Sequence, residues 1–228
     1  MFWYYDSYYL YLVLPAILIS LFAQMKVQST YKKYKKVMSA HGKTAADITR
    51  TILDSNGLQS VRLESVSGQL TDHYDPRADV VRLSDAVMHD TSVASIGVAA
   101  HEAGHAVQHH TGYFPIRARN AVLPVANFGS RLSVPLILLG IILSVQPLVS
   151  LGILLFSFVL LFQLITLPVE FNASRRAIAT LRESGVLKGQ ELSGAKAVLS
   201  AAAMTYVAAV LTSAAQLLRL VLLSRRRN

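Results

Sequence analysis

The sequence predicts a mainly α-helical, multi-pass membrane protein with a small α+β domain on the cytoplasmic side of the membrane. Hydrophobic residues make up 53% of the 228-residue chain and charged residues 15%, whereas soluble domains carry roughly 25% charged residues. Long uncharged stretches alternate with short basic ones. The chain contains no cysteine. Disulfides, thiolate metal sites and cysteine nucleophiles are therefore excluded, and a metal site must use histidine and carboxylate ligands.

Residues 1–25 are predicted to form a membrane anchor that stays attached to the chain. Leu10 to Phe22 is almost continuously apolar and lacks the basic flank of a secretory signal. Aromatic residues typical of a membrane interface surround its start, namely Trp3, Tyr4, Tyr5, Tyr8 and Tyr9. Lysines follow the anchor at positions 26, 32, 33, 35 and 36. The positive-inside rule makes this side cytoplasmic and explains the net charge of +9 without nucleic-acid binding.

Residues 132–169 are predicted to form a transmembrane helical hairpin. Leu132 to Val169 contains no charged residue, and as one helix it would far exceed the roughly 30 Å hydrocarbon core. The Gln146-Pro147 pair divides it into helices at Leu132 to Val145 and Leu148 to Leu167. Both ends are expected on the cytoplasmic side, because arginines flank the hairpin and its turn has none: Arg117, Arg119, Arg131, Arg175, Arg176 and Arg182.

Residues 197–228 contain a last uncharged stretch, Ala197 to Leu218, followed by a basic tail. A full crossing would place Arg225, Arg226 and Arg227 outside, against the positive-inside rule. A helix that packs over the cytoplasmic domain or lies in the interface would keep them inside. Both arrangements stay open. The cytoplasmic part then consists of residues 26–131 and 170–196.

The segment 26–131 contains a predicted strand at Val80 to Leu83 and a predicted helix at Ser92 to His109. His101-Glu102-Ala103-Gly104-His105 lies in this helix and has the pattern HExxH. Residues four apart share one helical face, so His101 and His105 can bind one metal ion, while Glu102 can reach a water on it. The pattern therefore predicts a metal site with an adjacent general base.

Three carboxylates follow His105 in the chain and are candidates for a third ligand: Glu170, Glu183 and Glu191. Glu170 is favoured, because it comes at the predicted cytoplasmic end of the second hairpin helix. Glu183 and Glu191 lie in polar sequence that suits a surface. The alternative to a ligand role for Glu170 is a salt bridge with Arg175 or Arg176. A metzincin site is excluded, because Thr111 stands where that class has its third histidine.

Four sequence segments together resemble the bacterial neutral zinc metallopeptidase family called YugP-like: HEAGHAVQ, DHYDPRADVVRLS, LPVEFNASRRA and AVLSAAAMTYVAAVLTS. The resemblance covers nearly the whole chain and extends, more distantly, to membrane-embedded gluzincins. It implies Zn²⁺ bound by His101, His105 and Glu170, with Glu102 as general base. Gluzincins usually have an acid four residues after the ligand glutamate, and here that residue is Ser174. Ser174 or Asn172 would then accept a hydrogen bond from a ring N–H.

Further roles follow as hypotheses. Stabilisation of the oxyanion needs a donor, for which His73, Tyr74, Tyr206 and Arg175 are candidates, and His73 and Tyr206 are the two we select. The strand Val80 to Leu83 could pair with an extended substrate as a sheet edge. His109 lies on the face of His105, where it could support the site or belong to a solvated helix end.

The favoured interpretation is a zinc endopeptidase of the cell membrane that cleaves unfolded or membrane-proximal polypeptides at the cytoplasmic face. A non-catalytic zinc-containing scaffold or regulator is the main alternative. A hydrolase of non-peptide amides or lipids is a third. A transporter is less favoured, because the hairpin has no ionisable residue. The sequence specifies neither the substrate nor the oligomeric state.

Overall fold

The computed structural model of the protein describes residues 7–68 and 71–225. The predicted interfacial residues Trp3, Tyr4 and Tyr5 and the tail residues Arg226 and Arg227 lie outside these ranges. The chain divides into two compact units. One consists of Met1–Gln24, Arg117–Pro168 and Met204–Asn228, and we call it the helical unit. The other consists of Met25–Ile116 and Val169–Ala203, and we call it the mixed unit.

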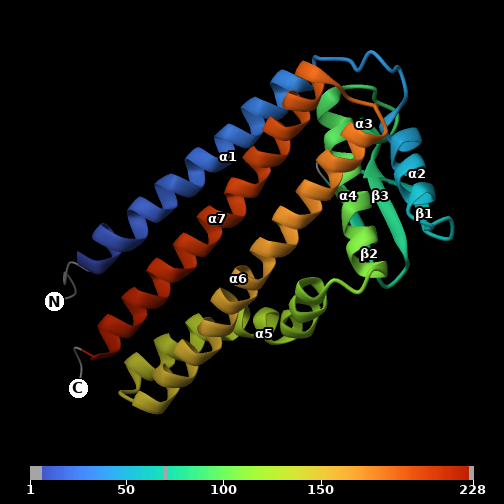
Figure 1. The fold of residues 1–228 in the computed structure, drawn as a ribbon. Coiled ribbons are helices and arrows are strands. Elements are labelled where there is room, and N and C mark those ends of the chain that lie inside the picture. Colours follow the sequence, from blue (N-terminus) through green and yellow to red (C-terminus); the bar gives the residue numbers. More distant parts are fainter. Residues whose placement is uncertain (1–6, 69–70, 226–228) are drawn as a thin grey trace. The chain divides into compact units, whose positions relative to one another are not determined.

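Four long helices account for the mainly helical fold and contribute to both units (Figure 1): α1 (Leu14–Tyr34, preceded by the π-helical turn Tyr9–Val13), α5 (Phe114–Ile142), α6 (Gln146–Glu183) and α7 (Gly189–Arg225). Each is long and apolar enough to cross a membrane. In the helical unit they expose large apolar side chains such as Leu18, Phe22, Leu139 and Leu154, a surface that suits lipid rather than water.

The predicted hairpin is present as α5 and α6, but both helices extend well beyond the expected spans. Pro147 does not lie in the turn. It is the second residue of α6, where its missing N–H costs no helical hydrogen bond. The turn comes earlier, with Ser144 in the left-handed region at φ 56°. Pro168 lies inside α6. Glu170 is therefore a mid-helix residue, and the expectation that it follows a helix end is wrong.

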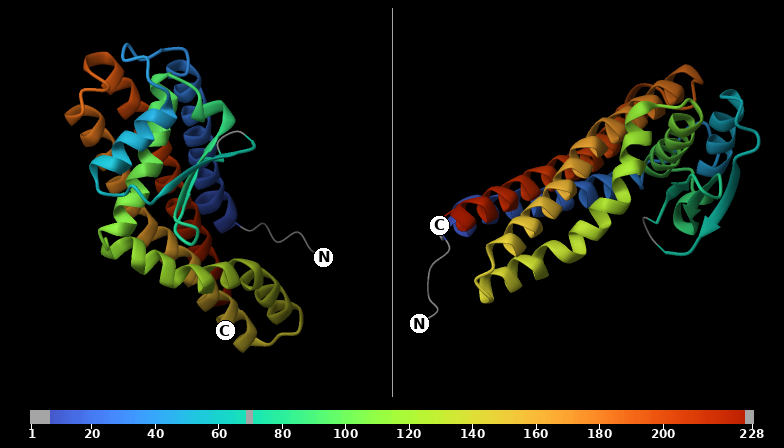
Figure 2. Two further views of the ribbon diagram at one scale, coloured as in Figure 1. Left: turned by 90° about the vertical axis from the view of Figure 1, so that its right-hand side faces the viewer. Right: turned by 90° about the horizontal axis from the view of Figure 1, so that it is seen from below.

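Inside the helical unit, glycines bring α5 and α6 together side by side (Figure 2). A Cβ on Gly152 would lie 2.8 Å from the Ser133 carbonyl oxygen, and one on Gly129 would lie 2.5 Å from that of Leu155. Only glycine allows such close approach of two backbones.

The C-terminal part of α7 belongs to the helical unit. It bonds to α1 through Ser20 and Thr212, whose hydroxyl oxygens are 2.9 Å apart. At its end, Ser224 accepts a hydrogen bond of 2.8 Å from Gln146 at the start of α6. Residues 204–225 therefore pack with α1 and α6, and α7 is long and apolar enough to cross a membrane.

The mixed unit contains a three-stranded sheet of β1 (Arg62–Val66), β2 (His73–Asp75) and β3 (Val80–Ser84) in the order β1-β3-β2. β3 pairs in parallel with β1 and antiparallel with β2. The predicted strand Val80 to Leu83 is confirmed, but its proposed position at the sheet edge is wrong. Val80, Val81 and Leu83 are fully buried, and a strand with so many buried apolar residues belongs in the centre of a sheet. β1 and β2 are the edges.

Three shorter helices complete the mixed unit: α2 (Ala45–Ser55), α3 (Asp85–Met88) and α4 (Val93–His110). Ser92 caps α4 by accepting a hydrogen bond from the Ser95 N–H, which confirms the predicted helix start. α4 packs against α2 (Figure 1). Its buried residues share one core with residues of α6 and α7: Ile96, Ala99, Ala103, Ala177, Leu181, Ala195 and Leu199. α4 is thus a buried helix, and this helix carries the HExxH pattern.

Candidate metal centre

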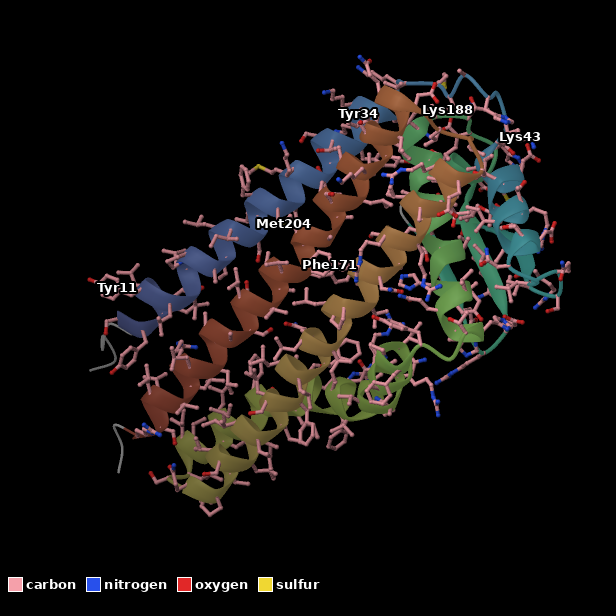
Figure 3. The ribbon with its side chains drawn as sticks, in the orientation of Figure 1. Tyr11, Tyr34, Lys43, Phe171, Lys188 and Met204 are labelled. Atoms are coloured by element: carbon pink, nitrogen blue, oxygen red, sulfur yellow. The ribbon has the colours of Figure 1, made fainter. Side chains whose placement is uncertain are left out.

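His101 and His105 project from the same face of α4, and Glu170 on α6 meets them there. Glu170 Oε2 lies 3.3 Å from His101 Nε2 and 3.6 Å from His105 Nε2. One ligand atom from each residue lies within 4.8 Å of the others, so the three side chains could hold a metal ion. Glu170 is only 4% exposed. It immediately precedes Phe171, which is labelled on α6 in Figure 3.

The small residues Gly104 and Ala173 allow α4 and α6 to approach closely at this point. A Cβ on Gly104 would lie 2.9 Å from the Ala173 carbonyl oxygen, closer than real Cβ atoms tolerate without some movement. The glycine of the HEAGH sequence therefore has a structural role. It lets a carboxylate from α6 reach histidines on α4.

Each histidine has a hydrogen-bond partner at its second ring nitrogen. Ser174 Oγ lies 3.2 Å from His101 Nδ1, as the sequence hypothesis for this residue requires. Gln108 Oε1 lies 3.0 Å from His105 Nδ1. Asn172, the other residue considered for this role, bonds to Gln108 and Arg176. The sequence interpretation missed Gln108, although its position three residues after His105 on the same helix was a usable signal.

Glu102 lies beside the histidines and accepts a 3.1 Å hydrogen bond from the Tyr74 N–H. Tyr74 is on β2, so this edge strand holds one oxygen of the carboxylate. Burial raises the pKa of Glu102, with the neighbouring histidines acting in the opposite direction. Burial lowers the pKa of His105, but the hydrogen bond to Glu170 and the nearby carboxylates outweigh burial and raise it overall. The pKa of each group therefore depends both on its burial and on its charged neighbours.

Tyr74 belongs to a second polar cluster that joins the end of α4 to the β2–β3 turn. Its hydroxyl donates to Asp79 Oδ1 at 2.8 Å and lies 3.1 Å from His109 Nδ1. His110 Nε2 lies 2.9 Å from the same Asp79 oxygen. Asp79 adopts φ 50°, a strained value for a residue other than glycine. His109 is thus packed against Tyr74 rather than free at a solvated helix end.

The remaining sequence candidates lie in different settings. His73 is exposed at the start of β2, with Nδ1 2.7 Å from the Thr71 carbonyl oxygen. Tyr206 lies in the part of α7 that belongs to the helical unit. The roles of both residues stay predictions. Arg175 is exposed, and its Nε donates to the Phe171 carbonyl oxygen.

The two other candidate acids are far less buried than Glu170. Glu183 is exposed at the end of α6. Glu191 lies in the first turn of α7, and its Oε1 accepts a hydrogen bond from the Ala40 N–H. Within the described ranges, only the combination of His101, His105 and Glu170 forms a group that could hold a metal ion.

Four helices that could cross a membrane and a His-His-Glu group that could hold a metal ion are the features of a membrane metalloprotein. Residues 9–225 match the model of the family described as "Putative neutral zinc metallopeptidase", and the chain therefore belongs to that family. It is also similar to the "Putative membrane protease YugP" of Bacillus subtilis (strain 168), with 48% identity over 215 residues. That match covers 94% of this chain and 96% of the relative. No solved structure matches the chain significantly.

The role of Gly104 can be tested against Gly97 on the same helix. We expect Gly104→Ala to destabilise the fold by about 1–3 kcal/mol, because the added methyl group meets a backbone oxygen. In Gly97→Ala the nearest atom is Ala195 Cβ at an ordinary 3.5 Å, so that variant should be as stable as the wild type or more so. Thermal unfolding in detergent measures both. Equal stability of the two variants would contradict the close-approach explanation.

Proposed function

We propose that this protein is an integral membrane zinc endopeptidase in which His101, His105 and Glu170 hold the metal and Glu102 is the general base. The observation that carries the proposal is the group of His101, His105 and the buried Glu170, with Glu102 directly beside His101 in the chain. Membership of a zinc metallopeptidase family and similarity to a membrane protease support it.

The donor set fits zinc. Two imidazole nitrogens and one carboxylate are the ligands of many catalytic zinc sites, which keep a fourth position for water or substrate. A zinc ion held by His101, His105 and Glu170 would supply Lewis-acid polarisation of the scissile carbonyl and would lower the pKa of a bound water to about 7. A purely structural zinc site normally has four protein ligands. A set of three ligands next to an acid that is not itself a ligand therefore favours a catalytic site over the scaffold alternative.

In this proposal Glu102 takes a proton from the attacking water and delivers it to the leaving amine. The Tyr74 N–H binds Oε2 of the carboxylate, which leaves Oε1 to carry the proton. Burial raises the pKa of Glu102, and a carboxyl group can both accept and donate a proton in such a reaction. His73 and Tyr206 remain our candidates for stabilising the oxyanion.

The substrate class we propose is unfolded or membrane-proximal polypeptide. Because β3 is interior, the strand edge next to Glu102 is that of β2. An extended chain that pairs with β2 would be held mainly by backbone hydrogen bonds, which carry little sequence selectivity. With only three residues, His73–Asp75, β2 offers a short edge, and because the Tyr74 N–H already bonds to Glu102, the pairing would use the other backbone groups of this strand.

We further propose that the mixed unit faces the cytoplasm. Its parts of α1, α6 and α7 carry many basic residues: Lys26, Lys32, Lys33, Arg175, Arg176, Arg182 and Lys196. The positive-inside rule assigns such a side to the cytoplasm. The chain would then comprise an anchor (1–25), a metallopeptidase segment (26–131), a hairpin (132–169), a segment with Glu170 (170–196) and an apolar C-terminal helix with a basic tail (197–228), which either crosses the membrane or packs on the domain.

The general base can be separated from the ligands by three acid-to-amide variants. We expect Glu102→Gln to keep one zinc ion per chain and lose at least about 100-fold in cleavage, because proton transfer fails while the ligands remain. Glu170→Gln should lose zinc and activity together. Glu183→Gln, which changes an exposed acid on the same helix, is the control and should keep both.

Metal analysis of purified protein and cleavage of a fluorogenic unfolded reporter provide the measurements. Full zinc in the wild type without cleavage by any form would favour the scaffold interpretation. Zinc retained by Glu170→Gln at wild-type affinity would remove Glu170 from the ligand set.

The orientation can be tested with single cysteines, because the chain has none of its own. Lys43, labelled in Figure 3, is exposed before α2, and Ser144 is exposed in the α5–α6 turn. In sealed right-side-out vesicles we expect a membrane-impermeant maleimide to label Ser144→Cys, and to label Lys43→Cys only after detergent is added. The reverse pattern would place the mixed unit outside.

A further inference from the structure

We propose that Gln108 is a positioning residue that fixes the tautomer of His105 and ties this histidine to the backbone next to Glu170. The inference rests on the proposed zinc site. Gln108 is fully buried on α4, although glutamine is usually an exposed residue. Its amide makes three hydrogen bonds, one to His105 on the same helix and two that link α4 to α6.

The orientation of this network follows from the chemistry of its members, starting at Arg176. A guanidinium group can only donate hydrogen bonds. Arg176 Nε lies 2.8 Å from Asn172 Oδ1, so this atom of Asn172 must be the amide oxygen. The same oxygen also faces Gln108 Nε2 at 3.0 Å. Gln108 must therefore present its NH₂ group to Asn172.

A second contact gives the same orientation independently. Gln108 Nε2 lies 2.8 Å from the Val169 carbonyl oxygen, and a carbonyl can only accept. Both hydrogens of the NH₂ group are then used, one for Val169 and one for Asn172. The amide oxygen of Gln108 must point the other way, toward His105 Nδ1 at 3.0 Å.

The histidine tautomer follows. Gln108 Oε1 is an acceptor, so His105 must carry a proton on Nδ1, and the neutral ring, which is the form that binds metal, then has its lone pair on Nε2. Nε2 is the atom that lies 3.6 Å from Glu170 Oε2 in the metal-binding group. Val169, held by the same amide, is the residue directly before Glu170. Gln108 thus positions one ligand through its side chain and a second ligand through the backbone.

An amide suits this position better than the carboxylate that often orients a zinc histidine. A glutamate here would place buried negative oxygens against the Val169 carbonyl and Asn172 Oδ1, neither of which is a donor. Glutamine instead offers both a donor group and an acceptor. The site therefore gains orientation without an additional buried charge.

The test is the zinc affinity of the purified full-length protein, measured by competition with a chromophoric chelator. In Gln108→Met the side chain keeps its length but loses all three hydrogen bonds. We expect its zinc dissociation constant to rise about 10–100-fold, the usual effect of removing such a partner. Asn172→Ala removes one of the two anchors of the amide and should raise the constant by a smaller factor. If Gln108→Met does not fold, Asn172→Ala provides the test instead.

Ile96→Ala is the matched control. Ile96 is also fully buried on α4 and belongs to the hydrophobic core, so its truncation lowers stability without touching the histidines. Its zinc affinity should equal that of the wild type. Wild-type affinity in Gln108→Met, or an equal loss in Ile96→Ala, would overturn the positioning role. A wild type that binds no zinc would instead overturn the metal site itself, and the role with it.

Discussion

The close contact between α4 and α6 is the constraint on which the candidate site depends. The two candidate ligand histidines lie on one helix and the candidate carboxylate on the other, and the three possible ligand atoms are within 4.8 Å of each other. Gly104 makes this possible, because any larger residue would meet the Ala173 backbone. Glu170 is held in the middle of a long helix rather than in a loop. A ligand on such a rigid element keeps its geometry better than one on a flexible connection.

The same contact buries polar groups that then need partners. Glu170 and Gln108 are almost completely shielded from water, and an unpaired buried polar group costs about 1–3 kcal/mol. Gln108 joins α4 to Val169 and Asn172, while Ser174 bonds to His101. These bonds satisfy the buried atoms and orient both histidines. The contact between α4 and α6 therefore determines both the packing of these helices and the geometry of the candidate site.

Local patterns in the sequence predicted the parts of the site that depend on spacing. Residues 101–105 predicted two ligands on one helix face, and the uncharged stretch 132–169 predicted the hairpin. Longer-range features could not be predicted this way. The central position of β3 depends on pairing with β1, and the burial of Gln108 depends on α6 packing. The length of α6 was missed because Pro168 is accommodated within the helix.

The residue four positions after Glu170 is a serine, so the group beside His101 adds no charge to the candidate site. With zinc bound, the two positive charges would be matched by the carboxylates of Glu170 and Glu102. The groups that bond to His101, His105 and Glu102 are neutral. They are the Ser174 hydroxyl, the Gln108 amide and the Tyr74 N–H, respectively. An acid in place of Ser174 would add a further negative charge close to Glu170 and Glu102, and buried charge is costly unless it is paired. A hydroxyl beside His101 orients the ring and preserves the balance.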